Sequence, residues 1–109
     1  MLIDTREVDG FTIETYAHHE NESPRGQFMN EDGSDDEETI AKIHNGEYAW
    51  FAAQVCASKA GITLGSDWIG CCCYESEAAF ITPDDGYWPD MVNAAITEAR
   101  AKLSELCAQ

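Results

Sequence analysis

The run Cys71–Cys73 is the densest group of reactive side chains in this sequence. On a β-strand, successive side chains alternate between faces, so Cys71 and Cys73 are expected on one face and Cys72 on the other. A Cys-x-Cys pair supplies half of a tetrahedral zinc site, which the pair His18–His19 or Cys107 could complete. The spacing fits no standard zinc pattern, and the simpler interpretation is that small apolar thiols fill a tight strand.

A cysteine nucleophile beside a histidine is the second chemistry that the composition allows. Cys56, Cys72 and Cys107 are the candidates, but no recognisable motif surrounds any of them. Phosphate-binding loops of the GxGxxG or GxxxxGK[ST] type do not occur. We therefore predict a protein that is not an enzyme and has no cofactor. The odd cysteine count and the absence of an apolar leader predict reduced thiols in the cytoplasm.

The acidic run Glu31–Glu38 requires a test for calcium. An EF-hand loop has glycine in its sixth position and an oxygen ligand in its first. If Gly33 is sixth, the loop begins at Phe28, and if Gly86 is sixth, it begins at Ile81. Neither side chain can bind a cation, so we predict no metal site.

Charge is the most unusual property of the chain. Twenty-one acidic residues face six basic ones, a net charge of -15 at pH 7. This balance excludes direct binding to a nucleic-acid backbone and disfavours anionic membranes, because both require lysine and arginine. It favours a basic protein partner. The alternative is that the charge serves only solubility or adaptation to high salt.

Rows of carboxylates could occupy the cationic groove of a nucleic-acid-binding protein, because duplex DNA presents one charge per ~1.7 Å. Exposed aromatic side chains would add apolar anchors, with Trp50, Trp68, Tyr87 and Trp88 as candidates. The predicted partner-binding residues form an N-terminal acidic group, a second acidic group and one aromatic anchor: Glu31, Asp32, Asp35, Asp36, Glu37 and Glu38; Asp67, Glu75 and Glu77; and Trp88. Asp84 and Asp85 would extend the second group.

Strands are expected first. Leu2–Val8 is predicted to be an edge strand that turns at Asp9-Gly10 into a half-buried strand over Phe11–Ala17, where apolar residues alternate. Residues 18–33 are predicted to form a long loop. A short acidic helix should follow over residues 35–44.

The boundaries of that helix follow from its capping residues. Ser34 is predicted as the N-cap and Glu37 as the third helical residue of a capping box. Asn45-Gly46 is predicted to end the helix.

The central segment over residues 47–59 is ambiguous, because its alternation suits a strand and its alanines suit a helix. We favour the strand, because Ala60-Gly61 would form a hairpin with Ile62–Leu64. Gly65-Ser66-Asp67 is predicted to interrupt the return strand as a bulge before it resumes through Trp68–Tyr74.

The last element is an amphipathic helix that begins near Pro89, with Val92, Ile96, Ala99, Leu103 and Leu106 on one face. We therefore predict a single α+β domain over residues 1–109. A small antiparallel sheet of three or four strands packs against this C-terminal helix, and the short acidic helix precedes the central hairpin.

The stretch YAWFAAQVCASKAGITLGSDWIGCCCYESEAAF, followed by DMVNAAITEA, resembles small acidic proteins encoded by bacteriophages and prophages. Phage proteins of this size and charge resemble inhibitors of host defence, namely anti-CRISPR proteins and DNA mimics. The resemblance implies a CRISPR effector complex or another basic nucleic-acid-binding protein as partner, in the cytoplasm of an infected bacterium. It carries over no functional residue, because such inhibitors share no motif.

The main hypothesis is thus a non-enzymatic inhibitor, either a monomer or a homodimer. One alternative is a small metal- or thiol-dependent protein centred on its cysteines. Another is a structural module that dimerises through the Val92–Leu106 face.

Overall fold

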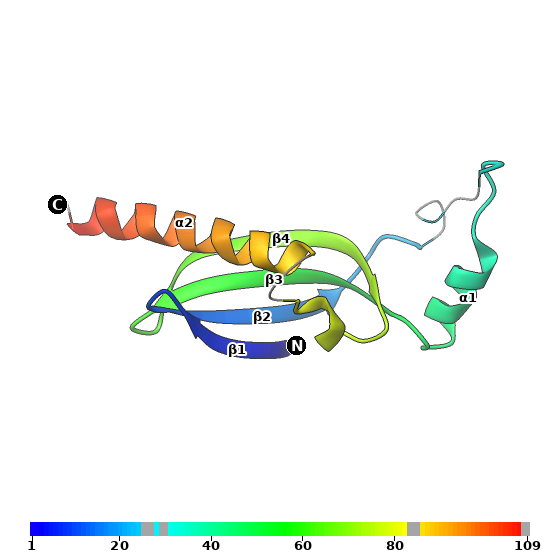
Figure 1. The fold of residues 1–109 in the computed structure, drawn as a ribbon, viewed down its shortest axis with the longest axis horizontal. Helices are drawn as coiled ribbons and strands as arrows, with labels where there is room; N and C mark the ends of the chain where they lie inside the picture. Colours follow the sequence, from blue (N-terminus) through cyan, green and yellow to red (C-terminus); the bar gives the residue numbers. More distant parts are fainter. Residues whose placement is uncertain (25–27, 29–30, 83–85, 108–109) are drawn as a thin grey trace.

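The computed structural model describes residues 1–24, 28, 31–82 and 86–107. Within them, it contains the strands β1 (Leu2–Val8), β2 (Phe11–His19), β3 (Ala49–Lys59) and β4 (Ile62–Tyr74), the helices α1 (Glu37–His44) and α2 (Tyr87–Cys107), and the 3-10 turn η1 (Ala78–Phe80). The strands form one antiparallel sheet in the order β1-β2-β3-β4. Helix α2 lies along one face of the sheet, and α1 stands beyond one end of it (Figure 1). The predicted α+β class is confirmed.

Two tight turns build the sheet as a meander. Asp9 and Gly10 join β1 to β2, and Ala60 and Gly61 join β3 to β4, with positive φ at all four residues. Two-residue turns of this kind match the right-handed twist of the strands that they connect. Within the ambiguous segment over residues 47–59, Ala49–Lys59 is a strand, as predicted, and the helical alternative is wrong.

The core lies between the sheet and α2. Cross-strand partners share a face, and Ile13 opposite Ala57 and Thr15 opposite Val55 mark the face that α2 covers. All four of these residues are fully buried. We call this the inner face and the opposite side of the sheet the open face.

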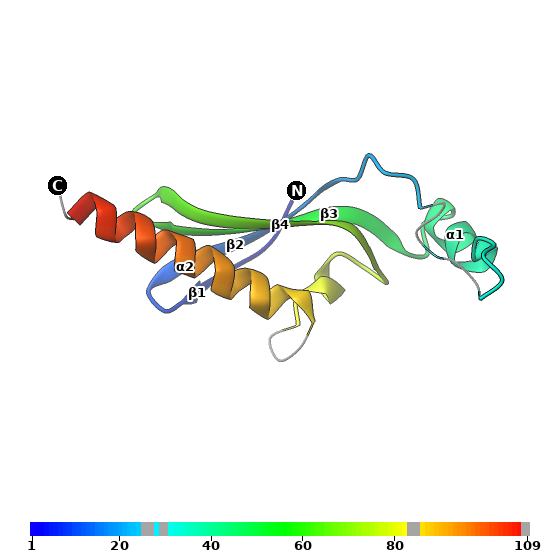
Figure 2. The same ribbon diagram turned by 90° about the horizontal axis from the view of Figure 1, so that it is seen from above.

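The predicted apolar face of α2 is only partly used. Val92, Ile96 and Ala99 are buried against the sheet, whereas Leu103 is half-buried and Leu106 is exposed. The C-terminal end of α2 extends past the sheet in both views (Figures 1 and 2), which leaves Leu106 uncovered. Because the sheet occupies most of this face, little of it is left for a dimer contact.

The short helix begins later than predicted. Its N-cap is Asp36, whose Oδ1 accepts the backbone N–H of Thr39 at 3.3 Å and whose Oδ2 accepts the Thr39 hydroxyl at 2.8 Å. Ser34 is therefore not the cap, and its backbone N–H donates to Asp32 Oδ1 at 3.0 Å instead. The carboxylate of Asp36, two residues later in the chain, thus takes the capping role that was predicted for the Ser34 hydroxyl. The end predicted at Asn45-Gly46 is confirmed.

Two further boundaries differ from the prediction. Strand β2 continues to His19, so the irregular connection begins two residues later than the predicted loop over residues 18–33. Strand β4 is continuous, and its register against β3 shifts once around Leu64 and once around Gly70–Cys71. The predicted interruption at Gly65-Ser66-Asp67 is thus a bulge at the preceding residue.

Candidate partner-binding site

The N-terminal acidic group forms one projecting unit, residues 31–44, which we call the acidic arm. It consists of a turn and α1, and it lies beyond the sheet at the end away from the C-terminal tip of α2 (Figure 2). Glu31, Asp32, Glu37 and Glu38 are exposed, and Asp35 and Asp36 are half-buried. The structure therefore brings all six predicted carboxylates together.

Two of these carboxylates also hold the arm in shape. Hydrogen bonds from the hydroxyl and backbone N–H of Ser34 lower the pKa of Asp32, and those from the same groups of Thr39 lower the pKa of Asp36. Both groups are therefore ionised at neutral pH. Substitutions aimed at binding alone should avoid them.

An aromatic pair anchors the acidic arm to the sheet. The Phe28 ring meets the Trp50 ring edge-on, with centroids 5.7 Å apart. Trp50 Nε1 donates to the Glu22 carbonyl at 2.9 Å, and the Asp36 N–H donates to the Phe28 carbonyl at 2.7 Å. Trp50 is thus half-buried by this contact and holds the arm in place.

The second acidic group is divided. Glu75 and Glu77 follow Tyr74, the last residue of β4, and Tyr74 pairs with Ala49, the first residue of β3. The acidic arm leads into β3, so these two glutamates leave the sheet at the same end as the arm. Asp67 lies in mid-strand opposite Val55, half-buried on the inner face, and is separate from them. Asp84 and Asp85 lie outside the described residues.

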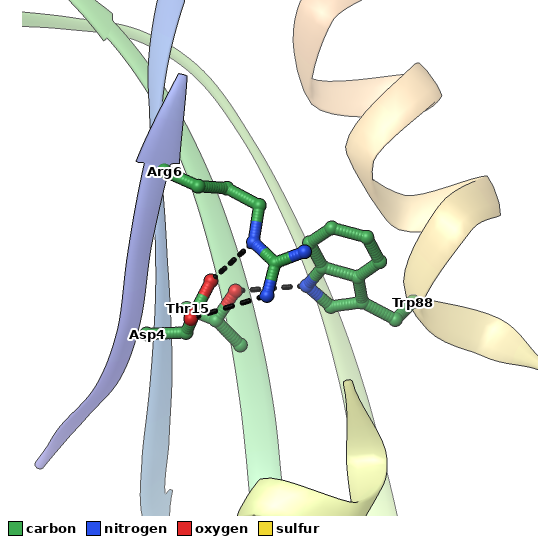
Figure 3. Close-up of polar contacts among 4 residues, drawn as sticks. All are labelled: Asp4, Arg6, Thr15 and Trp88. Atoms are coloured by element: carbon green, nitrogen blue, oxygen red, sulfur yellow. Dashed lines mark hydrogen bonds and ion pairs between the residues drawn. The ribbon is translucent and has the colours of Figure 1, made fainter. Parts of the chain in front are cut away.

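Trp88 is not the exposed anchor that the sequence suggested. Its side chain is 4 % exposed, and its Nε1 donates to the hydroxyl of the fully buried Thr15 at 2.9 Å. The Arg6 guanidinium lies over the Trp88 ring, 4.8 Å from its centroid, and bonds the Asp4 carboxylate at 2.7 and 3.2 Å (Figure 3). The prediction is corrected because Trp88, in the first turn of α2, packs into the core between the helix and the sheet.

A different set of aromatic residues is presented to solvent on the open face. Trp68 is 55 % exposed, and its ring stacks on the His18 ring with centroids 4.8 Å apart. The Tyr16 ring also stacks on the His18 ring, with centroids 6.0 Å apart. We call Tyr16, His18 and Trp68 the aromatic ladder. Alternation along β2 places Tyr16 and His18 on one face, but no local pattern in the sequence connects them with Trp68.

The cysteine run lies at the second irregularity of β4. Cys71 has a φ of 54°, and its backbone N–H donates to Glu20 Oε1. Cys72 pairs with Phe51 and is buried, whereas Cys73 pairs with Trp50, so these two lie on opposite faces as predicted. Cys71 lies in the bulge itself, where the register against β3 shifts. A pocket of about 250 Å³ lies here, lined by the three cysteines and by Phe28, Ile69, Gly70, Tyr74 and Tyr87.

These thiols are poor nucleophiles. Burial raises the pKa of Cys72 to about 11, and burial also raises the pKa of Cys56, Cys71 and Cys73. Among the described residues, no group of three or more histidine, cysteine, aspartate or glutamate side chains could hold a metal ion. The raised pKa values weigh against a thiolate nucleophile at Cys56, Cys71, Cys72 or Cys73.

Alkylation tests this conclusion. We expect iodoacetamide at pH 7 to modify Cys72 of the native protein on the order of 100-fold more slowly than a free cysteine, because only the thiolate reacts. Unfolding in guanidinium should restore the ordinary rate. Peptide-resolved mass spectrometry reads each cysteine separately. Rapid modification of Cys72 in the folded protein would show that an activated thiolate exists.

Comparison with protein-family models, curated proteins and solved structures found no match to this chain. Neither described helix is long and apolar enough to cross a lipid bilayer. The surface features that could bind a partner are the acidic arm, the two neighbouring glutamates and the aromatic ladder.

Proposed function

We propose that this protein is a non-enzymatic, phage-type inhibitor that binds the cationic nucleic-acid-binding surface of a host defence complex. Its action would be that of an anti-CRISPR protein or a DNA mimic, in the cytoplasm of an infected bacterium. The observation that carries the proposal is the concentration of carboxylates at one end of an elongated, strongly acidic molecule.

The overall dimensions suit a cleft that normally holds nucleic acid. The molecule measures 56 × 25 × 23 Å along its principal axes. A net charge of -15 over 56 Å is one charge per about 3.7 Å, close to the ~3.4 Å spacing of a single nucleic-acid strand. The density is roughly half that of a duplex.

The acidic arm is the part of this surface that a basic cleft would contact first. Its four exposed carboxylates project beyond the sheet, and Glu75 is exposed at the same end. Lys42 is the lysine of the arm, and it already lies 3.8 Å from Glu38 and over the Tyr48 ring. Such a one-sided field attracts a cationic partner over long range and speeds association.

Matched charge reversals test the proposal. The variants are Glu31→Lys/Glu38→Lys in the arm, Glu75→Lys/Glu77→Lys beside it, and Glu98→Lys/Glu105→Lys on the exposed side of α2 as control. All three change the net charge equally, so only the position of the charge differs. We expect the arm variant to weaken partner binding by about tenfold or more and to reduce its salt dependence, because several charge pairs are lost.

The measurement begins with capture of partners from a bacterial lysate at low and high salt. The dissociation constant of each variant is then determined for the captured complex, together with displacement of that complex's own nucleic acid. The expected partner releases its nucleic acid as this protein binds. Equal weakening by all three variants, or binding that ignores both salt and nucleic acid, would rule out the proposed mimicry.

A further inference from the structure

We propose that the aromatic ladder on the open face binds an arginine side chain of the partner, with the guanidinium plane stacked on Trp68. The proposed function supplies only the expectation that the partner is basic. The preference for arginine over lysine follows from the side chains of this chain and can be tested without the partner.

Trp68 is exposed yet held in one orientation. One side of its indole packs on His18 with an interplanar angle of 28°. His18 Nε2 and Gln54 Oε1 are 2.9 Å apart, in hydrogen-bond contact, and the Tyr16 hydroxyl donates to Glu14 Oε2 at 3.0 Å. Stacking and hydrogen bonding thus order a row of side chains across β2, β3 and β4 before any partner arrives, so little side-chain entropy is lost on binding.

The electrostatics of the open face favour a cation. Register places Glu7 opposite Thr12 and Thr5 opposite Glu14, so two carboxylates of the edge hairpin share this face with the ladder. The lysine and the arginine of the four strands lie on the inner face: Arg6 is opposite Ile13 and over the Trp88 ring, and Lys59 lies over the Phe11 ring. No lysine or arginine of the strands therefore competes for the exposed indole.

The inner face of the sheet already contains a half-buried contact of the kind that we propose for the open face. The Arg6 guanidinium lies over the Trp88 ring while a carboxylate, Asp4, binds its edge (Figure 3). A guanidinium is planar and weakly hydrated, so it can stack on an indole and bond carboxylates at the same time. An ammonium group is compact and strongly hydrated, and it gains less from an exposed ring. Trp and Arg are also the residues that most often dominate protein interfaces.

Two synthetic peptides with the same Gly/Ser spacing provide the probe, one with three arginines and one with three lysines. We expect the intact protein to bind the arginine peptide several-fold more tightly, with the largest NMR shift at the Trp68 indole N–H. In Trp68→Ala the two peptides should bind equally. Tyr87→Ala is the matched control, because Tyr87 is 59 % exposed but outside the ladder, and it should keep the preference.

Equal affinity of the two peptides for the wild-type protein, or an unshifted Trp68 indole on saturation, would overturn the inference. Both readouts use the unmodified protein and do not depend on the folding of a variant. If the arm reversal leaves partner binding intact while Trp68→Ala abolishes the arginine preference, arginine binding by the ladder is supported and nucleic-acid mimicry is ruled out. If the arm reversal weakens partner binding but the two peptides bind alike, nucleic-acid mimicry is supported and arginine binding by the ladder is ruled out.

Discussion

Replacement of Trp88 by alanine is expected to lower the free energy of unfolding by about 3–5 kcal/mol. Trp88 is 4 % exposed and joins α2 to the sheet through Thr15 of β2 and Arg6 of β1. Its removal leaves a cavity between α2 and the sheet and also deprives Arg6 of its stacking surface. Because small domains are stable by only ~5–15 kcal/mol, the variant should unfold at markedly lower urea concentration.

Trp68→Ala is the matched control for that measurement. Its indole is 55 % exposed, so we expect its loss to cost well below the Trp88 value, about 1 kcal/mol or less. Urea unfolding followed by circular dichroism compares both variants with the wild type. Similar losses for the two tryptophans would contradict the assignment of Trp88 to the core.

The hydrogen bond between Trp88 and Thr15 can be separated from the packing of the ring by a double-mutant cycle. Thr15→Val leaves the buried indole N–H without an acceptor, which should cost about 1–3 kcal/mol. Trp88→Phe removes the donor and part of the ring. The double variant should lose less than the sum of the two single variants, by ~1 kcal/mol, because neither orphaned group remains. Strict additivity would show that the bond contributes no coupling.

Gly65→Ala is expected to cost about 3 kcal/mol or more and to lower the melting temperature by roughly 10 °C or more. A Cβ at this position would lie 2.1 Å from the Ala95 carbonyl oxygen and 2.8 Å from the Ala99 nitrogen. Both are backbone atoms of α2, so no side-chain rotation can relieve the clash. The helix and β4 would have to separate, which would loosen the contacts of Val92 and Ile96 with the sheet.

Gly70→Ala is the control for this substitution, since it lies on the same strand and is also free of positive φ. The atom that its Cβ would approach, at 2.9 Å, is Oε1 of Glu20, the end of a flexible side chain. Rotation of Glu20 would cost its hydrogen bond from the Cys71 N–H but would not separate α2 from β4. We expect a clearly smaller shift in the melting temperature, measured by differential scanning calorimetry. A Gly65→Ala protein that melts like the wild type would show that α2 does not approach β4 as closely as the structure has it.

Local patterns in the sequence were sufficient for much of the fold. Alternation along Phe11–Ala17 identified β2 and its two faces, since side chains of a strand point alternately to either side. Asp9-Gly10 and Ala60-Gly61 located both hairpins, because few residue pairs accept the backbone angles of a two-residue turn. The exposure of the acidic arm was foreseeable for a similar reason, because adjacent carboxylates are rarely buried without partners.

The functional surface could be predicted only in part. The sequence indicated the acidic arm and its carboxylates, but it did not distinguish Trp68 from Trp88 as a surface anchor, and the choice of Trp88 was wrong. Both tryptophans lie in elements with one buried face, Trp68 in β4 and Trp88 in α2. The periodicity of the sequence does not show how far the helix covers the sheet, so it does not show which tryptophan is buried. The capping residue was misplaced because Ser34 and Asp36 both satisfy the local preference at an N-cap.

Composition and local spacing by themselves determined the charge, the strands, the turns and the position of α2, because these depend on contacts between near neighbours in the chain. Tertiary structure alone decided that His18 lies under Trp68, that α2 touches the backbone of β4 at Gly65, and that Trp88 meets Thr15. Each of these contacts joins residues about 30 to 70 positions apart. Strand register and the approach of the helix set them, and neither leaves a periodic signal in the sequence.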